Sequence, residues 1–331
     1  MSDSQNTTEL QAQAIEATPQ AETTTGPTST QSIFEILFAN EKATDELEEK
    51  IKDLLGSYIT SKLSEIRETY FPIFLWDSSE ISNFELDKIY EALAGNIDET
   101  GKPKLPVLLI LKSPGGSIEP AYKISKICNS MAKEKFVVCI PREAKSAATL
   151  ISLGATELHM GPLSELGPID PQIGGLPALG LQDSLKYIAS LVKEVPEAKD
   201  LFALYLNENF KMNYFGWTYR ITESAVQYGT RLLSLNSKKT GITTGEAESI
   251  PHKLVMEYKD HSFVIDFTEA QNVFKNKIVQ TGTKEIAVAE GLYSAISMLE
   301  LALRFRWKKR MTLVGNPMNR SGIHLFNLTN K

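Results

Sequence analysis

Cysteine and histidine are both scarce in this sequence. Its 331 residues include only 2 cysteines and 4 histidines. Cys139 falls in an apolar run typical of a buried strand, which argues against a disulfide framework and for a reducing compartment. No Cys/His spacing matches a zinc site, and no glycine pattern matches a Walker or dinucleotide motif. We therefore expect neither a metal nor a cofactor.

The sequence also lacks an excess of positive charge and a long apolar run. A net charge of −6 gives no electrostatic reason to expect nucleic acid as a partner. No stretch approaches the roughly 20 apolar residues of a membrane span. The N-terminus has no basic segment followed by an apolar one, as a secretory signal would. We expect a cytoplasmic protein with no membrane span.

Large apolar residues are nearly absent from residues 1–31, which consist mainly of Ser, Thr, Gln, Ala and Glu. Such a segment cannot offset the entropy lost on ordering, so we predict a disordered tail. Residues 32–70 carry apolar residues at helical spacing, among them Leu47, Ile51 and Leu54. This pattern predicts an N-terminal amphipathic helix that docks on the core or mediates assembly.

Short apolar runs alternate with helical segments through the middle of the chain. Strands are expected at 72–76, 107–111, 136–140 and 156–160, and helices at 84–93, 121–131, 147–153, 181–210 and 222–228. This alternation predicts an α/β fold whose mainly parallel sheet is covered on both faces. We assign residues 71–235 to the main domain and 236–331 to a C-terminal helical extension, with a long helix at 287–309.

A glycine turn follows the strand predicted at 107–111. In Ser113-Pro114-Gly115-Gly116-Ser117, the two glycines free the backbone to adopt conformations that other residues resist. Unpaired N–H groups at a turn from strand to helix suit a phosphate, a carboxylate or the oxyanion of a tetrahedral intermediate. The structural alternative is a tight connection that needs glycine.

A serine follows the strand predicted at 136–140. Ser146 precedes a helix of small residues, where the positive helix end would stabilise an alkoxide or an oxyanion. Its structural alternative is a helix N-cap. Small neighbours at Ala147 and Ala148 let a substrate backbone approach, and the Ala147 N–H can donate to an oxyanion.

Two prolines make the next segment rigid. Pro168 and Pro171 favour an extended stretch over 163–175 that lines a groove and presents Asp170 or Gln172 at a fixed angle. The structural alternative is a turn, because Asp before Pro is a common turn residue.

These three elements, in this order, resemble the Clp-protease/crotonase superfamily. Within it, the run through Ser146 and residues 165–172 look like the serine dehydrogenase proteinase family, which is related to signal peptide peptidase A. The resemblance spans about 106–175 and extends more loosely to 225–229 and 261–266. It implies a ββα spiral core with flanking helices, a peptide or protein substrate and a homo-oligomer.

The resemblance also implies roles for particular residues. Ser146 would attack the scissile carbonyl, while the N–H groups of Gly116 and Ala147 would form the oxyanion hole. The residues expected to contact substrate are Gly115, Ser117, Pro168 and Gln172.

The proton acceptor departs from the Clp pattern. When residues 169–175 are laid on the Clp run Ile-His-Gln-Pro-Leu-Gly-Gly, Asp170 takes the place of the catalytic histidine. An ordinary carboxylate, with a pKa near 4, is a poor base for a serine. Signal peptide peptidase relatives use a lysine, and Lys186 is the nearest counterpart, with Leu185 and Ile188 beside it to lower its pKa by desolvation.

Other bases and other functions remain open. His252 or His261, oriented by Asp260 or Asp266, would rebuild a Ser-His-Asp site. The leading prediction is an ATP-independent serine endopeptidase of the Ser/Lys type. The alternatives are a catalytically inactive Clp-like scaffold that binds a partner and a crotonase-type acyl-CoA enzyme, which uses the same oxyanion geometry without a nucleophilic serine.

Overall fold

The computed structural model describes residues 29–328 except 78, 174–175, 210–211 and 259. The tail predicted over 1–31 therefore lies outside the described residues, apart from its last three. Those three begin the first helix, α1 (Ser29–Ala39).

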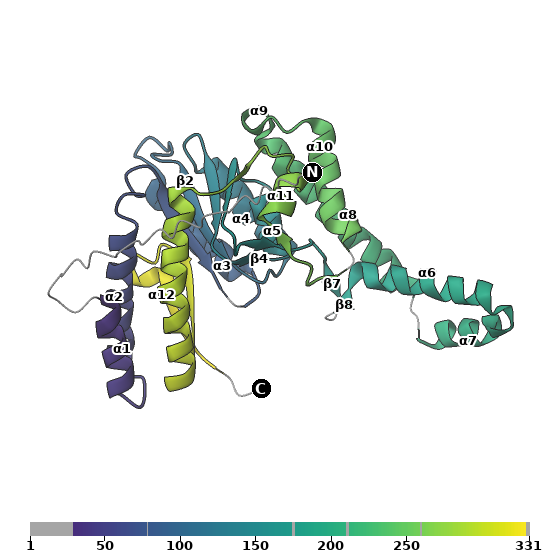
Figure 1. The fold of residues 1–331 in the computed structure, drawn as a ribbon, viewed down its shortest axis with the longest axis horizontal. Helices are drawn as coiled ribbons and strands as arrows, with labels where there is room; N and C mark the ends of the chain where they lie inside the picture. The colour runs from purple at the N-terminus through teal and green to yellow at the C-terminus, as the bar shows by residue number, and fades with distance from the viewer. Residues whose placement is uncertain (1–28, 78, 174–175, 210–211, 259, 329–331) are drawn as a thin grey trace, which may run out of the picture.

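A seven-stranded sheet forms the centre of the molecule, in the order β10-β5-β3-β2-β1-β11-β12 (Figure 1). From β10 to β1 neighbouring strands are parallel, and β11 and β12 are antiparallel to their neighbours. The predicted α/β class with a mainly parallel sheet is confirmed. The strands are β1 (Phe71–Trp76), β2 (Val107–Lys112), β3 (Phe136–Ile140), β5 (Glu157–Met160), β10 (Val279–Gln280), β11 (Lys309–Gly315) and β12 (Ile323–Asn327).

Helices cover both faces of this sheet, and the strands are apolar on both sides for that reason. In β2, Leu109 and Leu111 face one core, and Leu108 and Ile110 face the other. The first core packs against α3 (Asn83–Leu93), α4 (Ile118–Ser130), α5 (Ala147–Ser152), α8 (Met212–Leu235) and α10 (Thr244–His252). The second packs against α1, α2 (Asp45–Lys62) and α12 (Lys284–Arg306).

The C-terminal region differs from its prediction. Residues 236–331 were expected to form a helical extension, but they supply β10, β11 and β12 to the main sheet. Met311 and Leu313 of β11 enter the second core, while Val314 enters the first, so this strand is buried on both faces. Only two residues separate the end of α12 from the start of β11, and the basic residues in 304–310 hide the change from helical to strand periodicity. The N-terminal region also differs, because α1 and α2 replace one helix over 32–70.

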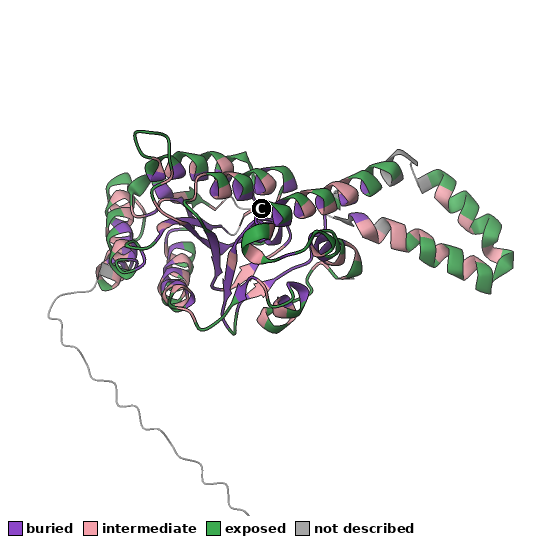
Figure 2. Cartoon of the chain, turned by 90° about the horizontal axis from the view of Figure 1, so that it is seen from above, coloured by how far each residue is buried: buried purple, intermediate pink, exposed green. Residues whose placement is uncertain are grey.

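An arm of helices projects from the sheet (Figure 1). It consists of α6 (Ala178–Glu194), η2 (Pro196–Ala198), α7 (Lys199–Asn209) and the first part of α8. The short helix expected at 222–228 is part of the much longer α8. Most of the arm's described surface is exposed or half-buried (Figure 2).

The remaining short elements are β4 (Glu143–Ala144), β6 (Glu165–Leu166), β7 (Gln172–Ile173), β8 (Leu176–Pro177), β9 (Ile265–Asp266), α9 (Ser237–Thr240), α11 (Phe267–Val273), η1 (Ala94–Asn96), η3 (Lys253–Glu257) and η4 (Arg320–Gly322).

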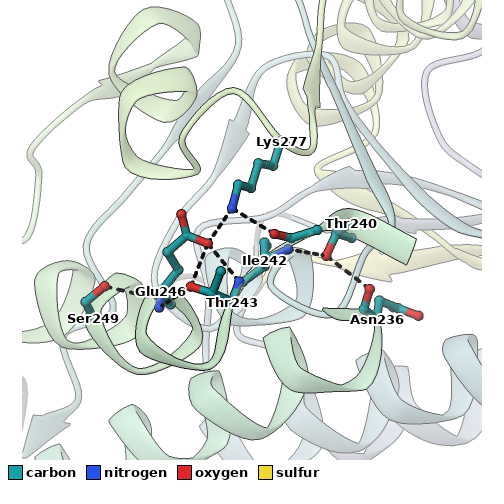
Figure 3. Close-up of polar contacts among 8 residues, drawn as sticks. Asn236, Thr240, Ile242, Thr243, Glu246, Ser249 and Lys277 are labelled. Atoms are coloured by element: carbon teal, nitrogen blue, oxygen red, sulfur yellow. Dashed lines mark hydrogen bonds and ion pairs between the residues drawn. The ribbon is translucent and has the colours of Figure 1, made fainter. Parts of the chain in front are cut away.

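A polar clamp fixes the start of α10 (Figure 3). The Lys277 ammonium pairs with Glu246 and donates to the Gly241 carbonyl at 2.8 Å. Glu246 also accepts the Thr243 N–H at 2.8 Å, which completes a capping box. Because α10 leads into η3, whose Leu254 carbonyl accepts the N–H of Ile169 at 2.9 Å, the clamp supports the segment that carries Asp170.

Replacing Glu246 with glutamine is expected to lower the melting temperature at neutral pH. The hydrogen bond from Lys277, followed by that from the Thr243 backbone, lowers the pKa of Glu246 to about 2 from 4.5. A lowered folded pKa stabilises the fold above the unfolded value, and this stabilisation is lost as pH falls from about 4.5 towards 2. Thermal unfolding across this range, with Glu248→Gln on the same helix as control, measures it. A difference that does not shrink with falling pH would contradict the assignment.

Candidate active site

Ser146 stands at a strained turn between β4 and α5. Its backbone has φ 50° and ψ −114°, a conformation that costs energy for any residue with a Cβ. Its side chain makes no capping hydrogen bond, so the N-cap alternative is not realised. A serine held in a strained turn from strand to helix is the arrangement that presents a nucleophilic hydroxyl.

The glycine turn packs directly against this serine. Gly115 has φ +113°, and a Cβ built on it would lie 2.8 Å from the Ser146 Cβ and 3.2 Å from the Ala147 nitrogen. Gly116 has φ +147°, and a Cβ there would lie 2.1 Å from the Ile81 nitrogen. Both positions therefore require glycine, for conformation and for space.

Backbone hydrogen bonds fix which way the turn faces. Gly116 forms a parallel bridge with Ile81, through the Ile81 N–H to the Gly115 carbonyl at 2.7 Å and the Ser117 N–H to the Ile81 carbonyl at 2.9 Å. In such a bridge, the N–H of Gly116 itself points to the opposite side. Ala147 begins α5, so its N–H has no partner within the helix. An oxyanion hole beside Ser146 would need two N–H donors of this kind.

Substituting Gly116 by alanine is expected to lower stability and to remove any activity at Ser146. The backbone strain alone costs about 1–3 kcal/mol, and the clash with Ile81 adds to it. Gly101→Ala is a matched control, because Gly101 also has a positive φ (+79°) but a Cβ there meets nothing within 4 Å. Thermal unfolding of both variants separates the clash from the strain. Equal losses of stability would show that the contact with Ile81 is unimportant.

The proline-containing segment lies beside the same turn. β6 pairs with β4, and the Thr149 hydroxyl lies 2.7 Å from the Gly167 carbonyl. Thr149 is one helical turn after Ser146, and Gly167 is three residues before Asp170. Segments far apart in the sequence are thus held together at the start of α5.

A third segment, residues 260–266, joins them. β9 pairs with β6 on the side away from β4, so β4, β6 and β9 form one small sheet. The Lys145 ammonium forms an ion pair with Glu165 at 3.1 Å and donates to the Phe263 carbonyl at 3.3 Å. Lys145, the residue next to Ser146, therefore ties the loop carrying His261 to the site.

His261 and Asp170 face each other across this junction. Their Nδ1 and Oδ2 atoms are 3.5 Å apart, and the side chains are 32% and 11% exposed. Burial raises the pKa of Asp170 more than the nearby His261 lowers it. Within the described part of the chain, Nδ1 of His261 and Oδ1 of Asp170 are buried without a hydrogen-bond partner. Only a small movement is needed to bring this pair into hydrogen-bond distance.

The environment of Lys186 does not support its predicted role as base. Its side chain is 76% exposed on α6 and pairs with Asp183 at 3.4 Å. The desolvation by Leu185 and Ile188 that would activate it is therefore missing, because these neighbours do not cover the ammonium group.

The other candidate residues have local environments that the structure defines. Asp260 and Asp266 accept the N–H groups of Ser262 and Glu269, and within the described residues the carboxylate recorded facing His261 is that of Asp170. Ser117 is the N-cap residue of α4, Pro168 is buried and Gln172 is exposed in β7. His252 is exposed on α10. The end of the run laid on the Clp motif, 174–175, lies outside the described residues.

The glycine turn, Ser146 and the proline-containing segment all fall in one family match, whereas residues 260–266 lie outside it. Residues 80–195 match the ClpP-like SDH-type serine proteinase family. This match confirms the resemblance found in the sequence and the Clp-protease-like fold. It also supports a peptidase function, since the family is one of serine proteinases.

Two curated relatives match shorter stretches of this chain. Uncharacterized protein MJ0137 of Methanocaldococcus jannaschii is 40% identical over 73 residues, which are 22% of this chain and 25% of the relative. Uncharacterized protein MJ1495 of the same organism is 36% identical over 80 residues, or 24% and 27% of the two chains. The chain thus covers about a quarter of the length of each relative.

Two solved structures with a distant likeness to this chain are those of proteases. The 1510-N membrane-bound stomatin-specific protease, as a mutant, is 14% identical with a TM-score of 0.38, over 79% of this chain and 93% of that one. A ClpP1 mutant from Listeria monocytogenes is 15% identical with a TM-score of 0.36, over 69% and 99%. TM-scores of this size say nothing about chemistry.

Sequence reasoning missed the pairing of His261 with Asp170. The two residues lie far apart in the chain, and each is ordinary in its local context. The available signal was the loose resemblance over 261–266, which contains the histidine but gives no partner for it.

Proposed function

We propose that this chain is a serine peptidase in which Ser146 is the nucleophile and His261, oriented by Asp170, is the general base. One observation carries the assignment of the base. His261 faces a buried carboxylate at 3.5 Å, on a loop that Lys145, the neighbour of Ser146, holds in place. Nucleophile, base and orienting carboxylate would then be Ser146, His261 and Asp170.

The chemistry of the two histidine nitrogens fits this assignment. Nδ1 faces Asp170, so a hydrogen bond to the carboxylate places the proton on Nδ1 and leaves Nε2 as the acceptor. Nε2 takes the proton of the Ser146 hydroxyl as its oxygen attacks the carbonyl carbon. The buried carboxylate of Asp170 then stabilises the imidazolium that forms.

The rest of the cycle uses the glycine turn. The N–H groups of Gly116 and Ala147 donate to the oxyanion of the tetrahedral intermediate. His261 returns its proton to the leaving amine as the peptide C–N bond breaks, and an acyl ester remains on Ser146. Water, deprotonated by His261, attacks this ester and releases the carboxylate product and the free serine.

The burial of the nucleophile limits the substrates. Ser146 is only 8% exposed, because the glycine turn and the start of α5 close around it. A folded protein surface cannot reach such a recessed hydroxyl, whereas an extended peptide can. We therefore propose unstructured peptides or unfolded segments as the substrate class.

Hydrolysis of a casein-derived peptide mixture by the full chain, without ATP, tests this function. Mass spectrometry should find new peptide termini with the wild-type chain and none with Ser146→Ala. No cleavage by a folded wild-type chain would instead favour the inactive scaffold. Cleavage that survives Ser146→Ala in a clean preparation would overturn the assignment of the nucleophile.

A further inference from the structure

Helix α12 is apolar on two opposite faces. One face packs in the second core through Ile286, Ala289, Leu292, Ile296, Leu299 and Leu303. The opposite face is an exposed stripe formed by Ala287, Gly291, Ser294, Met298, Leu301 and Phe305. These six residues follow one another at alternating intervals of four and three. Apolar residues at this spacing form the seam along which one helix packs against another.

Residue size changes along this stripe. Its first half is small, and a Cβ built on Gly291 would meet nothing within 4 Å. Its second half is large, with Met298, Leu301 and Phe305 exposed by 61%, 55% and 69%. These large residues border an apolar groove of about 490 Å³, whose other wall includes Phe34 and Phe38 of α1. Figure 1 shows α12 and α1 together at one edge of the molecule.

We propose that this stripe is the contact surface of a homodimer, in which α12 packs antiparallel against α12 of a second copy. A two-fold axis near the middle of the stripe places Ala287 opposite Phe305. The same axis places Gly291 opposite Leu301 and Ser294 opposite Met298. Each large side chain of one copy then meets a small one of the other, so the stripe is complementary to itself.

Charges beside the stripe fit the same arrangement. Glu290, Ser297 and Arg304 flank it on one side at seven-residue intervals. In an antiparallel pair, this flank meets its own copy, so Glu290 faces Arg304 of the second copy at both ends and Ser297 faces itself. The other flank is Val288, Ala295 and Ala302, which carry no charge and therefore create no repulsion. A parallel pair would instead place this charged flank against the uncharged one, so Glu290 and Arg304 would form no ion pairs across the contact.

A lipid bilayer is the competing occupant. Among the described residues, α12 is the one helix long and apolar enough to cross a membrane, although it contains no uninterrupted apolar run of that length. One such helix is weak evidence of a span, because the core helix of a soluble domain passes the same test. Here the buried face of α12 packs in the core beside β3 and β11. Spanning a bilayer would expose that core.

Cysteine crosslinking tests the geometry. Both native cysteines, Cys128 and Cys139, are buried, so an added surface cysteine reacts alone. Ser297→Cys lies near the two-fold axis and should form a disulfide-linked dimer on mild oxidation. Lys284→Cys, at the start of the helix, would lie about 35 Å from its copy at 1.5 Å per residue and should stay unlinked. No linkage at Ser297→Cys, or equal linkage of both variants, would overturn the antiparallel pairing.

Sedimentation equilibrium of the full chain tests the energetics. Leu301→Glu should weaken self-association roughly 30-fold or more, as expected for a central apolar contact, while Tyr90→Glu, a change at an exposed residue of α3, should not. Arg304→Glu should weaken it less, and adding Glu290→Arg should restore it. Unchanged association of Leu301→Glu would overturn the proposal, as would a wild-type chain that is monomeric in solution and loses only liposome binding on this substitution. The readout is independent of peptidase activity.

Discussion

Replacing Ser146 with alanine is expected to lower kcat for peptide hydrolysis roughly 10⁴- to 10⁶-fold, the loss typical of a removed serine nucleophile. The fold should survive, because Ser146 makes no capping hydrogen bond and alanine fits the space beside Gly115. Steady-state kinetics on a fluorogenic peptide measure the loss, and circular dichroism checks the fold.

Substituting a serine outside the site controls for differences in handling and purity between protein preparations. Ser184→Ala, at an exposed position on α6, should keep the wild-type kcat. A Ser146→Ala variant within tenfold of wild type would mean that another group performs the chemistry.

Replacing Asp170 with asparagine is expected to lower kcat about 10⁴-fold, because the amide holds the histidine in the wrong tautomer. The same change should leave the melting temperature at neutral pH unchanged or raise it. Burial raises the pKa of Asp170, so the folded state disfavours its carboxylate, and removing that charge relieves a cost that is present above the folded pKa. A loss of activity without a loss of stability would show that Asp170 serves function rather than the fold.

Two further substitutions decide between the candidate bases. His261→Ala should lose as much activity as Asp170→Asn, whereas Lys186→Ala should stay within about twofold, since Lys186 is a solvated lysine on the arm. If Lys186→Ala were inactive and His261→Ala active, the base would be a lysine, as first predicted from the family resemblance.

The parallel part of the fold could be predicted because its strands are short, continuous apolar runs between clear helix signals. The run 136–140 became β3 with the predicted bounds, and 107–111 became β2 with one residue added. β11 was missed because the basic residues around Trp307 continue the pattern of α12 with no turn residue between them. Hydrophobic periodicity cannot locate the boundary between a helix and a strand when no turn residue separates them.

The candidate site divides in the same way. Ser146 and the glycine turn are local features, so residue types and spacing in the sequence predict them. The strained backbone of Ser146, which lies beside Gly115, cannot be read from residue types. The base depends on a contact between distant segments, through Lys145 and the sheet of β4, β6 and β9, which no local pattern encodes.

The rate at which a fluorophosphonate labels Ser146 tests the central claim most directly, because labelling requires both the nucleophile and its base. Mass spectrometry of digested protein locates the adduct and follows its formation. We predict a single adduct on Ser146 in the wild type, formed at the same rate in Lys186→Ala and at least 100-fold more slowly in His261→Ala. No adduct on Ser146, or equal rates in the wild type and His261→Ala, would contradict a serine peptidase activated by His261 and Asp170.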